Sequence, residues 1–365
     1  MPRNPRALTA AALLALALPL GALAPASATG DSEPPLSSSR QGGPFVSQDG
    51  TQVSGPNTFP RDLVVAPNGL RAYQLDEDRL AVLDVTQRPS PVVARATTVF
   101  GSDLAMRRDS RWAYVVNDDR LQVVDVSKQR PRRVREMSAA VPDDALDVAI
   151  APNGKHLYIS YGSGFGAPDQ GVRVMSLASP AKPRPVARVD VGTLPAGLAV
   201  SGDSKRVVTA NALVGDATVI DTSRPSKPRV IRKRLDLPFD VEAVAMVGST
   251  AYLWGADDSR LAVVGAGRGT LNRVKNLAPG NDGGGYIAVS GDKRYLVVTH
   301  DQQPDDRILT IVERNGLRPV QAFVGTSFPG GLDTADRGPA KGDLFVVAGT
   351  GLSSPEGFFP FTRAG

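Results

Sequence analysis

The sequence predicts an all-β fold built from one repeated unit, and three observations support this prediction. First, a phrase recurs, because Asp62-Leu-Val-Val-Ala-Pro-Asn-Gly69 returns as Asp147-Val-Ala-Ile-Ala-Pro-Asn-Gly154. Second, successive units start 41 to 50 residues apart, close to the length of a four-stranded propeller blade, about 40–45 residues. Third, short apolar runs alternate with turn residues, without a helical period. We therefore expect a seven-bladed β-propeller of four-stranded antiparallel blades, with six or eight blades as alternatives.

The second unit shows the order of strands most clearly. Its expected strands are residues 103–106, 112–116, 121–126 and 133–137. The turn after the second strand is Asn117-Asp-Asp119, whose residues tolerate left-handed backbone. Pro131 ends the third strand region, since proline cannot donate to a ladder. The units start near Asp62, Asp103, Asp147, Gly197, Ala243, Tyr286 and Leu332.

The seventh unit lacks a fourth strand of its own. Its expected strands are Leu332–Thr334, Leu344–Val347 and Phe358–Phe361, after which the given sequence stops. The N-terminal segments Pro44–Ser47 and Thr51–Val53 are candidates for the fourth strand. We expect one of them to close the ring, because closure leaves no unpaired edge between the first and last blades.

Three third strands of the repeat have similar sequences: Leu80-Ala-Val-Leu-Asp-Val85, Leu121-Gln-Val-Val-Asp-Val126 and Thr218-Val-Ile-Asp-Thr222. These strands and the proline-rich turns after them resemble the LVIVD repeat. The Ala-Pro-Asn-Gly turns resemble those of the related YVTN and lactonase-like propellers. The resemblance covers roughly residues 60 to 350. It implies a seven-bladed propeller, often on an extracytoplasmic protein, and it implies no single chemistry.

The N-terminus has the pattern of a secretory signal over residues 1–28. Arg3 and Arg6 precede an apolar stretch from Ala7 to Leu23, and Ala26-Ser-Ala28 fits a cleavage site. Residues 29–43 are polar and rich in Gly, Pro and Ser, which is typical of a flexible linker. The propeller domain is expected over 44–365, and the protein is expected to be secreted, with an association with the cell wall left open.

Composition excludes several classes of function. The chain has no cysteine, so neither a disulfide framework nor a cysteine-linked lipid anchor is expected. No second apolar run is long enough to span a membrane. The formal charge of +5 falls to about +3 without the signal arginines, too weak a charge for a nucleic-acid partner. We expect a monomer.

Charge is predicted to separate between the two sides of the ring. We call the side that carries the turns between second and third strands, and the links between blades, the top. Those turns are acidic, as in Asp118-Asp119 and Asp257-Asp258, whereas the bottom turns between third and fourth strands are basic, as in Lys128 and Arg130. The charges could simply suit tight turns and protect strand edges. Alternatively, the basic side could dock on an anionic wall polymer or a membrane surface.

The candidate ligand-binding residues are expected at the top. Asp62, Asp103 and Asp147 open first strands, and Glu242 lies near the equivalent place in the fifth unit. First strands line the channel, so these carboxylates could form a ring able to hold Ca²⁺. The structural alternative is that each aspartate binds the backbone of a neighbouring blade. No other cofactor is expected, and two histidines without cysteine do not predict a zinc site.

Two other residues are candidates for chemistry or binding. His300 ends a second strand beside Asp301 and could act as a general base there. Phe165 lies in the longest loop, Tyr161–Gly171, where an aromatic side chain could anchor a ligand. No convergent catalytic set is evident. The sequence therefore favours a secreted, non-enzymatic propeller that binds a protein or envelope polymer, with a lactonase-like hydrolase acting at the top channel mouth as the alternative.

Overall fold

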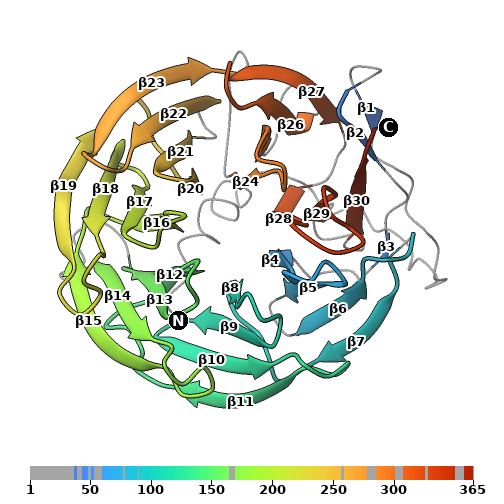
Figure 1. Cartoon of the computed structure of the whole chain (residues 1–365), viewed down its shortest axis with the longest axis horizontal. Helices are drawn as coiled ribbons and strands as arrows, with labels where there is room; N and C mark the ends of the chain where they lie inside the picture. The colour runs from blue at the N-terminus through green and yellow to red at the C-terminus, as the bar shows by residue number, and fades with distance from the viewer. Residues whose placement is uncertain are drawn as a thin grey trace, which may run out of the picture.

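The structure is a ring of seven antiparallel sheets (Figure 1). This computed structural model describes residues 37–38, 43–47, 51–52, 60–76, 79–88, 90–163, 169–255, 259–277, 285–300, 307–324, 328–349 and 357–364. Within these residues the chain forms β-strands and no helix, so none is long and apolar enough to cross a membrane. The predicted all-β, seven-bladed propeller is confirmed.

Blades one to five each contain four consecutive strands. Blade one comprises β4 (Pro60–Val65), β5 (Arg71–Asp76), β6 (Leu80–Asp84) and β7 (Val92–Ala96). Blade two comprises β8 (Asp103–Met106), β9 (Trp112–Asn117), β10 (Arg120–Asp125) and β11 (Arg132–Met137). Blade three comprises β12 (Ala145–Ile150), β13 (His156–Tyr161), β14 (Gly171–Ser176) and β15 (Arg184–Asp190). Blade four comprises β16 (Pro195–Val200), β17 (Arg206–Asn211), β18 (Asp216–Asp221) and β19 (Arg229–Asp236). Blade five comprises β20 (Ala243–Val247), β21 (Thr250–Gly255), β22 (Arg260–Gly265) and β23 (Thr270–Asn276).

Blades six and seven take strands from the N-terminal segment. Blade six comprises β24 (Ile287–Val289), β25 (Tyr295–Thr299), β26 (Arg307–Glu313), β27 (Arg318–Val324) and the added β1 (Ser37–Ser38). Blade seven comprises β28 (Phe328–Thr334), β29 (Leu344–Gly349), β30 (Gly357–Arg363), β2 (Phe45–Ser47) and β3 (Thr51–Gln52).

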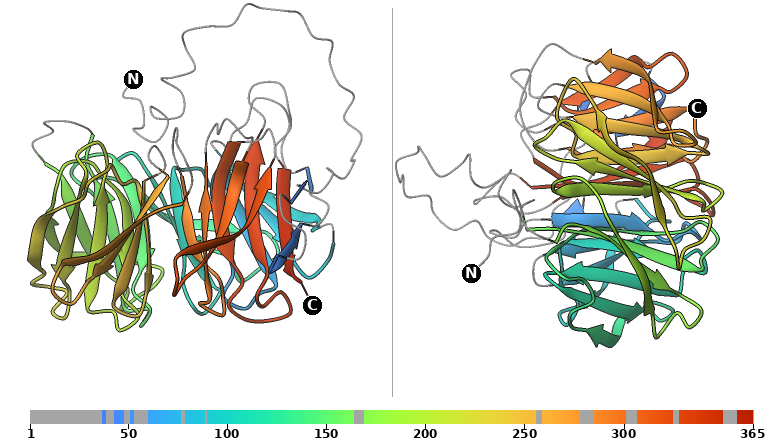
Figure 2. Two further views of the ribbon diagram at one scale, coloured as in Figure 1. Left: turned by 90° about the horizontal axis from the view of Figure 1, so that it is seen from above. Right: turned by 90° about the vertical axis from the view of Figure 1, so that its left-hand side faces the viewer.

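The first strand of every blade lies innermost, and each inner strand contacts those of the two neighbouring blades. Figure 2 shows the ring from the side, with the strands running across its thickness. Apolar clusters fill the space between blades, as where Tyr114 and Val123 of blade two pack with Leu157 and Ile159 of blade three. The apolar residues of one repeat are therefore buried by the next repeat, as in other stacked architectures.

The N-terminal segment closes the ring, as the sequence predicts. Phe45, Val46 and Ser47 pair with Arg363, Thr362 and Phe361 of β30. β3 pairs with the same strand further along. The side chain of Gln321 holds the backbone of Phe45 on both sides, accepting from its N–H at 3.0 Å and donating to its oxygen at 2.7 Å. Both predicted N-terminal segments thus take part in closing the ring, because β2 and β3 pair with different parts of β30.

One short strand was not predicted. The expected signal segment, 1–28, and most of the expected linker, 29–43, lie outside the described residues. Within that linker, Ser37 and Ser38 pair with Val324 and Phe323 of β27. Blade six therefore has five strands, and its outer edge is covered by backbone from the N-terminal segment.

Candidate functional site

The three repeated aspartates bind the backbone of the next blade. Oδ2 of Asp62 accepts from the N–H of Leu104 at 2.9 Å, and Oδ2 of Asp103 accepts from Val148 at 2.6 Å. Asp147 accepts from Leu198 at 2.8 Å in the same way. Each donor belongs to the inner strand of the following blade. The geometry therefore matches the structural alternative, in which the repeated carboxylate ties one blade to the next.

The series of aspartates stops where backbones approach each other closely. Gly197 and Gly331 occupy the equivalent positions of blades four and seven. A Cβ atom on Gly197 would lie 2.6 Å from the backbone oxygen of Glu242, and one on Gly331 would lie 2.7 Å from the nitrogen of Leu63. Glu242 is half-buried, and its own N–H donates to the oxygen of Trp254 at 3.0 Å. Neighbouring inner strands at these two places thus leave no room for a side chain.

The top of the channel shows no cluster of metal ligands in the part of the chain that the structure describes. No three acidic or histidine side chains there come together in a way that could hold an ion. Blade six also reaches blade one at this end, because the hydroxyl of Tyr286 donates to the backbone oxygen of Arg61 at 3.3 Å. Calcium binding by the aspartate ring stays a prediction.

His300 lies between blades five and six and is 1% exposed. Its Nε2 is 2.9 Å from the hydroxyl of Thr310 on the third strand of blade six. Its ring meets that of Trp254 edge-on, with centroids 5.3 Å apart. These contacts lie on the second and third strands and not on the inner strands. Its role as a general base stays a prediction, because the acidic residues beside it, 301–306, lie outside the described residues.

Two predicted site residues lie outside the described part of the chain. Phe165 belongs to 164–168 and Asp301 to 301–306, and both segments lie outside the described residues.

The predicted acidic top is visible at blades two and three. There, burial raises the pKa of Asp144, and the charges of Asp143, Asp118 and Asp119 raise it further.

Cations gather on the outer strands of blades two to five. We call them the cation belt. Its members are Arg132, Arg133 and Arg135 of β11, Arg184 and Arg188 of β15, Arg229, Arg232, Lys233 and Arg234 of β19, and Arg273 and Lys275 of β23. The acids on these four strands are Glu136, Asp190 and Asp236. By comparison, β7 carries only Arg95, β27 only Arg318, and β2 no charge. The belt therefore covers one arc of the ring.

Most members of the cation belt form no ion pair with the described residues. Arg133 pairs with Glu136, Arg188 with Asp169 at 3.1 Å, and Arg229 with Asp221 at 3.3 Å. Arg273 donates to the backbone oxygen of Gly316 at 3.0 Å. The other members form no ion pair with a residue that the structure describes, and nearly all are exposed. The bottom turns beside the belt add further exposed cations, namely Lys128, Arg130, Lys182, Arg224, Lys227 and Arg268. This arc therefore presents a surface of positive charge.

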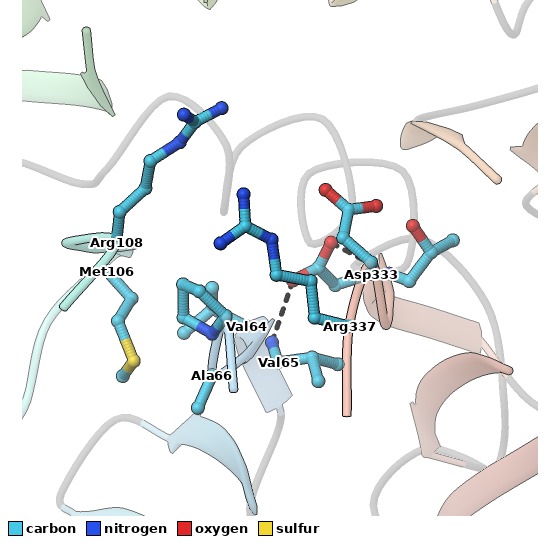
Figure 3. A pocket seen from close by; sticks show the side chains of 10 residues that line it. Val64, Val65, Ala66, Met106, Arg108, Asp333 and Arg337 are labelled. Carbon is cyan, nitrogen blue, oxygen red and sulfur yellow. Dashed lines mark hydrogen bonds between the residues drawn. The ribbon is translucent and has the colours of Figure 1, made fainter. Parts of the chain in front are cut away.

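A pocket of about 210 Å³ lies where the inner strands of blades seven, one and two end, at the bottom of the ring. Asp333 is at its floor, where Oδ2 accepts from the N–H of Val65 at 2.7 Å (Figure 3). Burial raises the pKa of Asp333 to about 7, and the charge of Asp336 adds to the rise. Arg108 and Arg337 extend toward the same side of the pocket in Figure 3. We call this space the bottom pocket.

Sequence reasoning missed the bottom pocket, although a signal was present. The position of Asp333 in the repeat holds a small apolar residue in the six other blades, namely Val64, Ala105, Ala149, Ala199, Ala245 and Ala288. The position of Asp336 and Arg108 holds proline or glycine in the five others, namely Pro67, Pro152, Gly202, Gly248 and Gly291. Charged residues that depart from the repeat, rather than those that follow it, mark the pocket.

Comparison with solved structures shows the fold. The β-propeller domain of Cps50 (Swd1) from Myceliophteria thermophila has a TM-score of 0.63 at 12% identity, over 87% of this chain and 99% of that chain. Hydrazine synthase of Kuenenia stuttgartiensis has a TM-score of 0.59 at 19% identity, over 84% of this chain and 95% of that chain. A protein of unknown function from Desulfotomaculum acetoxidans DSM 771 has a TM-score of 0.59 at 16% identity, over 79% and 88% of the two chains.

These likenesses extend no further than architecture. No protein-family model and no curated protein matches the sequence. At identities this low, a shared fold carries no shared activity. The propeller implied by the resemblance to LVIVD and YVTN repeats is supported, whereas membership of that repeat family stays a prediction.

Proposed function

We propose that this protein is a secreted binding scaffold, without chemistry of its own, that docks on an anionic polymer of the cell envelope through the cation belt. The predicted signal at residues 1–28 supports secretion. The observation that carries the proposal is the concentration of exposed, mostly unpaired cations on β11, β15, β19 and β23. A surface field of one sign attracts a partner of the other sign and speeds encounter with it.

The shape of the belt favours a polymer over a bilayer. Outer strands of four neighbouring blades follow the convex rim of the ring (Figure 1). A flat membrane meets a convex rim at one blade, whereas a flexible chain can follow the rim and contact all four strands. The bottom turn cations project from one side of the ring and would suit a flat surface better. The two sources of negative charge therefore engage different cations.

Edge protection is the competing explanation for the belt. Charged side chains on an outer strand hinder pairing with another sheet. Blades six and seven have β1 and β2 on their outer side, and their outer strands carry few charges. However, β19 alone carries four cations, Arg229, Arg232, Lys233 and Arg234. Edge protection by itself makes no prediction about binding, so a binding measurement separates the two explanations.

The test is sedimentation of the purified protein with isolated cell walls, with anionic vesicles and with buffer, each over a salt series. Two variants lose the same charge. The strand variant is R132Q/R135Q/R184Q/K233Q, and the turn variant is K128Q/R130Q/R224Q/K227Q. An exposed ion pair contributes about 0.2–1 kcal/mol, so four lost contacts weaken binding by roughly fourfold or more.

We expect salt-sensitive pelleting with walls that the strand variant weakens more than the turn variant does. Screening shortens the reach of exposed charges to about 8 Å at physiological ionic strength, so binding must fall as salt rises. Pelleting with vesicles that depends on the turn cations would instead identify a membrane surface as the partner. An absence of pelleting at low salt would overturn the proposal and leave edge protection as the role of the belt.

A further inference from the structure

The bottom pocket has a composition that the repeat does not require. Repeated residues serve the stacking of blades, as Asp62, Asp103 and Asp147 do. Asp333 and Asp336 of blade seven have no acidic counterpart at the same positions of the other blades. Charges that interrupt a repeat and meet at one cavity point to a ligand rather than to the scaffold.

Charges of both signs share the pocket without forming ion pairs. Arg108 and Arg337 are exposed, and neither guanidinium pairs with a carboxylate among the described residues. Partial burial raises the pKa of Asp336, and the charges of Lys293, Arg108 and Arg337 lie close enough to offset part of that rise. A ligand of a single sign would therefore meet like charge somewhere in the pocket, whereas a ligand with both signs would meet a complement at each end.

The remaining walls of the pocket are mostly apolar. Val64, Val65, Ala66, Pro67 and Met106 supply them, and the one other polar residue, Thr334, already donates its hydroxyl to the backbone oxygen of Val289 at 2.7 Å. The volume of about 210 Å³ equals that of about seven liquid waters, at roughly 30 Å³ each. It therefore admits a molecule of well under drug size with a short apolar side chain, since pockets for drug-sized ligands are about 300–1,000 Å³.

We propose that the bottom pocket binds a small zwitterion of the α-amino acid type. Its carboxylate lies between the guanidiniums of Arg108 and Arg337, and its ammonium group faces the carboxylate of Asp336, above Asp333, whose two oxygens accept from the N–H groups of Val65 and Thr334 at 2.7 Å each. Its side chain lies against Val64, Ala66, Pro67 and Met106. This site is separate from the cation belt, and its occupancy does not depend on the envelope polymer.

The test measures binding of L-valine to the purified full protein by calorimetry and by ligand-observed NMR. Two relatives of the probe each lack one charge: N-acetyl-L-valine keeps the carboxylate, and L-valinamide keeps the ammonium group. We expect saturable binding of L-valine and at least about tenfold weaker binding of both relatives, because each loses a charge-assisted hydrogen bond. Equal binding of N-acetyl-L-valine would show a simple anion site and overturn the proposal, as would the absence of any saturable binding.

Variants locate the site. R337Q and D336N change exposed residues, so they leave the fold intact, and each should weaken L-valine binding at least about fivefold. K205Q removes an exposed cation from the bottom turn of blade four and should leave it unchanged. D333N is compared only after its unfolding temperature has been measured, because Asp333 also binds Val65. Wild-type affinity in both R337Q and D336N would overturn the proposal, whereas wild-type affinity in the strand variant separates this site from the belt.

Discussion

Aspartate has two different roles in this ring, and its partners decide which. Asp103 sits at a repeated position, and its carboxylate satisfies the backbone N–H of Val148 on the next blade. Asp333 also binds the next blade, through Val65 and at a position where no other blade carries an acid. Unlike the repeated aspartates, it faces a pocket and shares that pocket with Asp336. A raised pKa at such a place is typical of functional sites, although structural networks also produce one.

The raised pKa of Asp333 predicts how stability depends on pH. In the unfolded chain this carboxyl titrates near its ordinary value of 3.8, whereas burial raises its pKa in the folded state to about 7. Between these values the folded state keeps a proton that the unfolded state releases. The contribution of this group to the free energy of unfolding therefore falls as pH rises from about 4 to about 7, by up to about 4 kcal/mol at 1.36 kcal/mol per pKa unit.

D333N should remove this slope. The measurement is the free energy of unfolding by urea, from pH 4.5 to 8, for wild type and variant. The carboxylates whose pKa is lowered, such as Asp221 and Asp292, lose their contribution as pH falls below about 4, outside this window. We expect the difference between the two proteins to change with pH across the window. A constant difference would mean that Asp333 titrates normally.

At the scale of elements, the spacing of inner strands determines which residues fit. β16 and β20 approach so closely that a Cβ on Gly197 would lie 2.6 Å from the backbone oxygen of Glu242 and 3.0 Å from Cα of Ala243. Neither of these atoms belongs to a flexible side chain that could move aside. In blades one to three an aspartate fills this place and bridges to the next blade, as Asp147 does to β16. The same position thus holds a bridging aspartate in blades one to three and a glycine in close backbone contact in blades four and seven, whereas blades five and six carry Ala243 and Tyr286 there.

Gly197→Ala should destabilise the protein by about 1–3 kcal/mol, the usual cost of overpacking a buried site. Gly267→Ala is a matched control, because a Cβ there would meet nothing within 4 Å and the residue is exposed. Thermal unfolding of both variants beside wild type makes the comparison. If Gly197→Ala were as stable as Gly267→Ala, the strands would be able to separate freely, and the close approach would not explain the glycine.

At the scale of the whole molecule, both ends of the chain build one blade. β2 supplies the outer strand of blade seven, and its Phe45 is 2% exposed. Phe45 packs in the cluster shared by blades six and seven and meets the ring of Tyr295 edge-on at 6.1 Å. The guanidinium of Arg363 lies 5.0 Å from the centroid of the same phenylalanine ring. Closure therefore depends on side-chain packing as well as on backbone pairing.

Phe45→Ala should lower the free energy of unfolding by about 3–5 kcal/mol, the range found when a buried aromatic side chain is truncated. Val46→Ala changes the next residue of the same strand, which is 49% exposed, and should change stability by less than about 0.5 kcal/mol. Urea unfolding of the two variants tests the contrast. Similar losses in both would indicate that β2 contributes through its backbone alone.

The sequence by itself determined the architecture. Alternating apolar runs at a spacing of 41 to 50 residues can be buried only against a neighbouring copy, so the period predicts four-stranded blades. The last unit lacks a fourth strand, and this predicts that an N-terminal segment closes the ring, as Phe45–Ser47 does. These are local patterns, and each strand can be recognised without its partners. The pairing of Ser37–Ser38 with β27 was not predicted, because two serines carry no apolar pattern.

The tertiary structure alone decided what the charged residues do. The sequence placed Asp62, Asp103 and Asp147 at strand starts, but only the placement of the next blade shows that backbone N–H groups use their carboxylates. Likewise, Arg108 and Asp333 lie 225 residues apart in the chain and meet only because closure brings blade seven beside blade one. Strand patterns depend on neighbours in sequence, whereas a site between blades depends on the ring, and that is why the first could be predicted and the second could not.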